Sequence, residues 1–84
     1  MKTHKLKILS EYFQMQLESK KNFEIRKNDR NYHVGDLLIL KEYDPETKRF
    51  SGRYMGVKVT YITDYKQRDG YVVLGTKFVY SPVW

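Results

Sequence analysis

Five strand-type segments around one helical pattern constrain the fold of this 84-residue chain. Each segment is short, carries alternating or continuous apolar residues, and is bounded by turn residues such as Gly35-Asp36 and Asp44-Pro45. Strands this closely spaced favour a mostly antiparallel sheet, and so small a sheet commonly curls into a barrel that removes its edges. The sequence therefore predicts a mainly β, α+β fold with about five strands, at His4–Ile8, Asn22–Lys27, Leu37–Tyr43, Arg53–Thr63 and Tyr71–Phe78.

One helix is predicted between the first two strands. Its apolar stripe follows the i, i+3, i+4, i+8 spacing of a single helical face and consists of Leu9, Tyr12, Phe13 and Leu17. Ser10 is the expected N-cap, and the helix is expected to end at Ser19–Lys21, where cations are favoured by the carbonyl end. We expect this N-terminal helix to cover one opening of the barrel, with residues 1–84 forming a single domain.

The positive charge of the chain is concentrated in Lys20–Arg30, which carries half of the net charge of +6. Inside this segment Phe23 and Ile25 alternate with polar residues at the period of a half-buried strand, so we expect this apolar pair to face the core. The opposite face then holds an amide, a carboxylate and a guanidinium about 7 Å apart, too far for close pairing without help from elsewhere.

Several classes of protein are excluded by residues that the chain lacks. There is no cysteine, so disulfides, thiol nucleophiles and thiolate zinc sites are ruled out. The longest aliphatic run, Leu37–Leu40, is far too short to cross a bilayer, and no apolar segment of a signal peptide follows the first lysines. His4 and His33 have no neighbour at ligand spacing. We therefore expect a cytoplasmic protein with no membrane contact, no metal and no cofactor.

The basic balance of the chain suggests an anionic partner. Sixteen Lys and Arg face ten Asp and Glu, and aromatic residues make up 15% of the chain. Basic charge attracts phosphates irrespective of sequence, and exposed aromatic rings stack on unpaired bases. This composition favours RNA or a nucleotide as partner. It also has a plain structural interpretation, because tyrosines suit strands and charged residues suit solvent-facing surfaces.

Four groups of residues, in this order, resemble the ASCH domain, a branch of the PUA-like superfamily of small β-barrels. They are Lys21-x-x-Glu24-x-Arg26 directly after the helix, Val34–Ile39 opening a strand, Lys41–Pro45, and Gly70–Gly75. The likeness covers nearly the whole chain and is nearest to the short, often phage- or prophage-associated ASCH-like domains. The family pattern has glycine where this chain has Ser19.

This resemblance implies a cleft beside the helix, lined by Lys21, Glu24 and Arg26, that holds RNA or a modified nucleotide. The guanidinium of Arg26 can donate two parallel hydrogen bonds to a phosphate, and Glu24 could accept a hydrogen bond from the amino group of a base. Further residues are candidates for contacts with the nucleic-acid backbone or, in the case of the tyrosine, for stacking on a base. They are Lys27, Arg30, Tyr32, Arg53 and Lys58.

Two other functions are left open by the sequence. One branch of the resembled family is an amidohydrolase acting on acetylcytidine, in which a lysine equivalent to Lys21 acts with a threonine and a later glutamate. This chain has Glu24 in place of that threonine. The connection between Asp64 and Gly70 is too short to provide the later glutamate. In this alternative Lys21 and Glu24 would be the catalytic pair. The other function is a phage accessory domain that binds a protein partner.

Each candidate also has a structural interpretation. Lys21 can serve as the cation at the end of a helix. Glu24 and Arg26 can form an ion pair that holds the fold together. Tyr32 can pack its loop against the barrel. Whether the face of Glu24 and Arg26 opens to solvent decides between a binding site and a structural pair.

Overall fold

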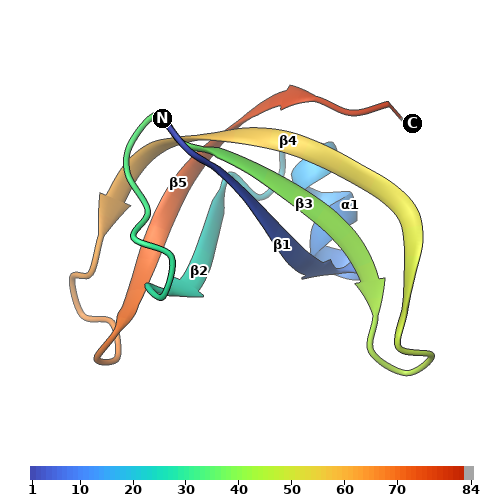
Figure 1. Cartoon of the computed structure of the whole chain (residues 1–84), viewed down its shortest axis with the longest axis horizontal. Helices are drawn as coiled ribbons and strands as arrows, with labels where there is room; N and C mark the ends of the chain where they lie inside the picture. Colours follow the sequence, from blue (N-terminus) through green and yellow to red (C-terminus); the bar gives the residue numbers. More distant parts are fainter. Residues whose placement is uncertain (83–84) are drawn as a thin grey trace.

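The computed structural model describes residues 1–82. Five strands form a single curled sheet, and one helix lies beside it (Figure 1). The strand order is β1-β3-β4-β5-β2, with β1 parallel to β3 and the other neighbours antiparallel. The predicted mainly β fold with five strands and an early helix is confirmed. The elements are β1 (Thr3–Leu9), α1 (Ser10–Leu17), β2 (Phe23–Lys27), β3 (Leu37–Asp44), β4 (Arg49–Thr63) and β5 (Tyr71–Tyr80).

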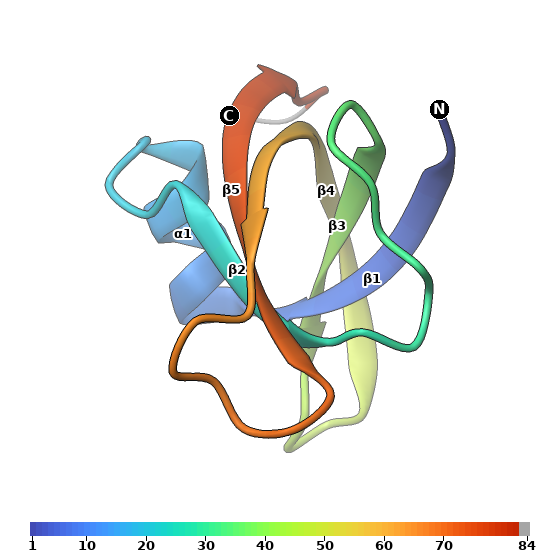
Figure 2. The ribbon, with the colours of Figure 1, turned by 90° about the vertical axis from the view of Figure 1, so that its left-hand side faces the viewer.

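The sheet is an open half-barrel. The long strand β4 arches across the molecule in Figure 1, with α1 under one half of the arch and β2 under the other. Figure 2 shows the same sheet curling toward a barrel, with β1 and α1 on opposite sides. Within residues 1–82 no ladder joins the two edge strands β1 and β2. The expected closure is therefore incomplete, and the gap between the facing edges of β1 and β2 is called the seam below.

The core is built from the helix, four strands and one loop residue, without β2. Its buried apolar side chains are Leu6, Ile8, Phe13, Tyr32, Leu38, Leu40, Met55, Val57, Val59, Val72 and Leu74. Phe13 is fully buried and Leu17 packs at the margin of this core, so the helix is held by the apolar surface that it removes from water.

Strand β2 has the predicted alternation, but its faces are reversed. Phe23 and Ile25, expected in the core, are 42% and 53% exposed, whereas Glu24 is only 3% exposed. Alternation defines two faces of a strand without saying which one is buried. Here the inward face belongs to a carboxylate, and the apolar pair lies on the molecular surface.

The helix is shorter than expected and uses a different cap. It begins at Ser10 with Leu9 at the N-cap and no side-chain capping bond, and it ends at Leu17. Ser19 then takes a positive φ of 58°, the left-handed conformation that favours glycine and that turns the chain toward β2. Tyr12, predicted on the buried stripe, is 41% exposed. Residues 1–82 contain no helix that is long and apolar enough to span a membrane.

A buried acid–histidine pair fixes the start of β1 against the loop that precedes β3. Asp36, 2% exposed, lies 2.8 Å from Nε2 of His4 and accepts from the backbone N–H groups of Lys2 and His33, each at 3.0 Å. Burial alone would raise the pKa of Asp36, but these hydrogen bonds hold it well below its ordinary value. Gly35, with φ of 96°, supplies the turn that brings this carboxylate inward.

Candidate functional site

A buried carboxylate on β2 lies at the centre of the predicted site. Oε2 of Glu24 accepts from the ammonium of Lys21 and from Nε2 of Gln16, which is 3.1 Å away. Oε1 accepts from Nε and Nη2 of Arg26 at 3.1 and 2.8 Å. Both oxygens are therefore occupied by donors from three residues. The structure brings Lys21, Glu24 and Arg26 together as one cluster, called the Glu24 cluster below.

Close pairing along β2 was expected to need help from elsewhere, and that expectation is wrong for Arg26. Its long side chain folds back along the strand and reaches Glu24 two residues away. The same guanidinium also crosses the seam, where Nη2 donates to the backbone carbonyl of Lys7 at 2.6 Å. Arg26 thus links the two edge strands in place of a ladder.

Gln16 explains why Glu24 and not its apolar neighbours faces inward. This helical residue is 3% exposed, and its amide donates to Glu24 and to the carbonyl oxygen of Phe23. Its carbonyl oxygen in turn accepts from the hydroxyl of Thr76 on β5 at 3.3 Å. Buried polar groups need such partners, and a chain from β5 through the helix to β2 provides them.

A hollow of about 460 Å³ opens beside the helix, next to the Glu24 cluster. Apolar side chains that are each at least 40% exposed form much of its wall, and they are Leu9, Tyr12, Phe23 and Ile25. The buried Ile8, three cations and one carboxylate complete it, the charged residues being Lys7, Lys21, Arg26 and Glu24. The ammonium of Lys21 lies over the rings of Tyr12 and Phe23 at 5.5 and 4.8 Å. This feature is called the helix-side hollow.

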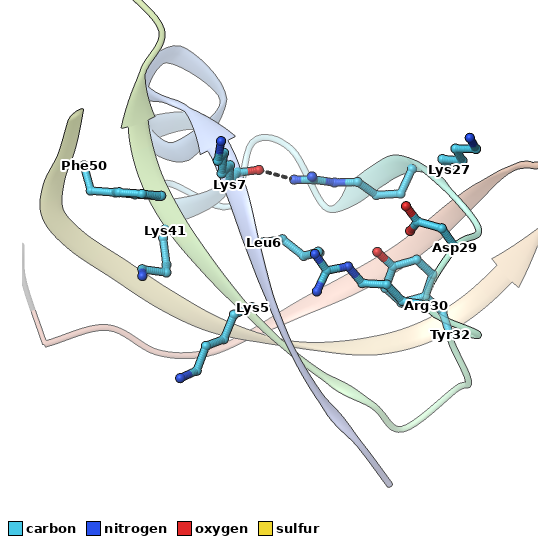
Figure 3. Close-up of a pocket in the computed structure, with 10 residues that line it drawn as sticks. Lys5, Leu6, Lys7, Lys27, Asp29, Arg30, Tyr32, Lys41 and Phe50 are labelled. Carbon is cyan, nitrogen blue, oxygen red and sulfur yellow. Dashed lines mark hydrogen bonds between the residues drawn. The ribbon is translucent and has the colours of Figure 1, made fainter. Parts of the chain in front are cut away.

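A second hollow of about 410 Å³ lies on the other side of the bond between Arg26 and Lys7. Figure 3 shows it, with the dashed line marking that bond. Its walls also include Leu6, Asp29, Tyr32 and Phe50. It is called the basic hollow, because six cations line it: Lys5, Lys7, Arg26, Lys27, Arg30 and Lys41.

Arg53 and Lys58 line none of the hollows described in residues 1–82. Arg53 instead pairs with Glu42, donating from Nε to Oε1 at 2.9 Å and from Nη2 to Oε2 at 3.0 Å. Its guanidinium also lies 4.7 Å from the ring centre of Phe13. Hydrogen bonding by Arg53 outweighs burial and lowers the pKa of Glu42.

Tyr32 lies in the wall of the basic hollow with its ring buried. The side chain is 6% exposed and meets the ring of His4 edge-on, with 4.8 Å between the ring centres. Burial raises the pKa of the Tyr32 hydroxyl. The structure thus places Tyr32 where it packs the loop against the sheet.

Sequence reasoning missed four contributors to these hollows and to the Glu24 cluster: Lys5, Lys7, Gln16 and Lys41. Lys5 and Lys7 alternate with Leu6 and Ile8, so the sequence placed them on the outer face without revealing their proximity to Arg30. Gln16, three residues after Phe13, carried a usable signal, because a polar residue on a buried helical face needs a partner. Residues 1–82 contain no group of acidic, histidine or cysteine side chains arranged to hold a metal.

Comparison with known proteins gives two findings. Residues 3–76 match the model of a family described as "Domain of unknown function (DUF3850)". A 74-residue stretch is 42% identical to the "Uncharacterized 12.9 kDa protein in GpA 3'region" of Escherichia phage P2. The matched stretch covers 87% of this chain and 66% of that relative, so it spans slightly less than two thirds of the phage protein.

Proposed function

We propose that this chain, which belongs to the family described as "Domain of unknown function (DUF3850)", is a module that binds RNA or a modified nucleotide in the helix-side hollow. One observation carries the proposal: exposed apolar side chains and cations share this hollow, and the one carboxylate among its described wall residues, Glu24, already accepts four hydrogen bonds. A nucleotide has a matching composition, with a flat base for the apolar wall and an anionic phosphate for the cations.

The chemistry of the wall supports this choice. Phe23 and Tyr12 offer aromatic surface at the mouth of the hollow, and stacking on such rings contributes about 1 to 3 kcal/mol per base. Arg26 and Lys21 are 23% and 15% exposed, so both cations remain reachable although they are paired. Because Glu24 pairs with two cations, the Glu24 cluster retains one net positive charge.

The proposed kinship with the ASCH domains of the PUA-like superfamily agrees with this assignment. The curled sheet, the helix beside Lys21 and the position of Glu24 and Arg26 at a hollow are what that kinship leads one to expect. The left-handed Ser19 occupies the position at which the family pattern has glycine. These features support the kinship, and the binding proposal rests on the hollow itself.

Binding is favoured over the amidohydrolase alternative by the occupancy of its two catalytic candidates. The ammonium of Lys21 donates to the carbonyl oxygen of Phe23 at 2.6 Å as well as to Glu24. Glu24 accepts from three residues. Glu24 therefore has no free lone pair with which to take a proton from a substrate, and two of the three N–H groups of Lys21 are committed to these acceptors.

A titration with labelled nucleic acids tests the proposal. Single-stranded RNA, duplex RNA and DNA are titrated against the wild type and Arg26→Ala, each at two salt concentrations. We expect a preference for one RNA form, salt-dependent affinity, and loss of that preference in the variant. Weak and equal binding to every nucleic acid, unchanged in Arg26→Ala, would contradict the proposal and favour a protein partner instead.

A further inference from the structure

The basic hollow gathers positive charge from three separate parts of the chain. Lys5 and Lys7 come from β1, Lys27 and Arg30 from the end of β2 and the following loop, and Lys41 from β3. Figure 3 shows Arg30 reaching from its loop toward Leu6 of β1. Among residues 1–82, Asp29 is the one carboxylate in the wall. A concave surface lined by one sign of charge concentrates ions of the opposite sign.

Five of the six cations of the basic hollow differ from those of the Glu24 cluster in having no carboxylate partner among the described residues, and the exception is Arg26, which belongs to both. Within residues 1–82, the lysines of this hollow and Arg30 make no ion pair. Lys7 lies over the ring of Tyr43 at 4.5 Å and Lys41 over that of Phe50 at 4.6 Å. These ring contacts hold the side chains in place and leave their N–H donors available to an anion.

The two hollows adjoin at the seam, where they share two wall residues. Lys7 and Arg26 line both, and the bond from Arg26 to the Lys7 carbonyl marks their border. The Lys2 carbonyl accepts from Leu37 on β3, and alternate residues of a strand direct their backbone groups to opposite sides. The backbone N–H groups of Lys5 and Lys7 therefore point toward the seam and add donors there.

We propose that the basic hollow binds the backbone phosphates of a single-stranded polynucleotide, one nucleotide of which occupies the helix-side hollow. This inference rests on the proposed function and names its ligand class: a strand of several nucleotides instead of a free nucleoside. A strand that leaves the helix-side hollow passes Arg26 and next meets the lysines of β1 and β3. A single strand fits because its base must be unpaired to enter the helix-side hollow.

The test compares two pairs of lysines with equal change in charge. Lys5→Gln/Lys41→Gln removes two cations of the basic hollow, whereas Lys58→Gln/Lys77→Gln removes two exposed cross-strand neighbours outside every described hollow. Each variant, the wild type and Phe23→Ala are titrated with a single-stranded RNA dinucleotide and with a strand of about eight nucleotides. The titrations are repeated over a salt series and with single-stranded DNA and polyglutamate as competitors.

We expect the longer RNA to bind more tightly than the dinucleotide. Lys5→Gln/Lys41→Gln should weaken the binding of the longer RNA roughly tenfold and have little effect on the binding of the dinucleotide. For the longer RNA, this variant should also reduce the slope of log K against log salt by about 1.4. The control pair should change neither slope nor affinity appreciably. If single-stranded DNA competes as strongly as RNA, the basic hollow binds phosphates and the 2′-hydroxyl has no role in binding.

Equal weakening by the two lysine pairs would overturn the inference and leave the proposed function intact, provided that Phe23→Ala still weakens both RNAs. Polyglutamate that competes as well as RNA would also overturn it, because the hollow would then be a surface for acidic protein. No RNA binding by the wild type would overturn both proposals. No effect of Phe23→Ala would contradict the helix-side assignment alone.

Discussion

Two buried glutamates of this fold each pair with an arginine, yet their surroundings differ. Glu42 and Arg53 form a balanced pair whose guanidinium is covered by Phe13, and neither residue lines a hollow described in residues 1–82. Glu24 pairs with two cations, and Arg26 lines both the helix-side and the basic hollow. The ion pair at Glu42 thus joins β3 to β4, whereas the ion pairs at Glu24 hold two cations in place at the helix-side hollow.

The largest expected effect comes from neutralising the two carboxylates. Glu24→Gln leaves two partly buried cations without a counter-charge and should lower the free energy of unfolding by about 3 kcal/mol, or Tm by about 15 °C. Glu42→Gln frees only Arg53, which is 30% exposed, and should cost about 1.5 kcal/mol. Urea unfolding measures both. Equal losses would contradict the distinction between the two clusters.

Both arginines hold a buried glutamate, but only Arg26 should contribute to binding. Arg53→Ala leaves Glu42 with Ser51 as its remaining hydrogen-bond donor on β4 and should cost about 2 kcal/mol of stability, with affinity for single-stranded RNA unchanged. Arg26→Ala should weaken RNA binding about tenfold. Thermal unfolding and fluorescence anisotropy on the same samples measure the two quantities. A loss of RNA affinity in Arg53→Ala matching that in Arg26→Ala would remove the distinction.

Acid should weaken the pair at Glu42. The pKa of Glu42 lies below its ordinary value of 4.5, so its contribution to stability is complete above about pH 4.5 and is lost as pH falls through the lowered pKa. Asp36, whose pKa is also lowered, adds to the same decline. Glu42→Gln should therefore show a shallower fall of unfolding free energy between pH 5 and pH 3. A slope equal to that of the wild type would contradict this account.

The smallest effect concerns two residues in left-handed turns. Ser19 precedes the Glu24 cluster with φ of 58°, and Lys48 lies in the hairpin between Glu42 and Arg53 with φ of 56°. Glycine at either position should stabilise the fold by about 0.5 kcal/mol, because it adopts this conformation without strain. Only Ser19→Gly should alter RNA affinity, since this turn positions Lys21. An altered affinity in Lys48→Gly would be the contrary result.

Much of the fold was predictable because turn residues and apolar alternation are local signals. The five strands and the helix match within a few residues at most ends. Alternation could not orient β2, because its inward face is stabilised by hydrogen bonds from Gln16 of the helix, which no local pattern of β2 encodes. Incomplete closure was also hidden, since it depends on how far the edges of β1 and β2 stand apart.

The site was predictable only in part, because it depends on distant contacts. Lys21, Glu24 and Arg26 are near in sequence and do form one cluster. The contact between Arg26 and Lys7 joins residues nineteen positions apart, across strands that are not neighbours in the sheet. Arg53 is a cation like Lys21 and Arg26, but it pairs with Glu42. Its charge alone could not predict that pairing.

The most direct test of the central claim is to map bound single-stranded RNA by NMR on the labelled protein. The signals to follow are the backbone amides and the arginine Nε–Hε groups. We expect large shifts at Lys7, Phe23 and the Arg26 side chain, and small ones at Glu42 and the Arg53 side chain. Shifts centred on Glu42 and Arg53, or spread evenly over all exposed lysines, would contradict the assignment of the helix-side hollow as the binding site.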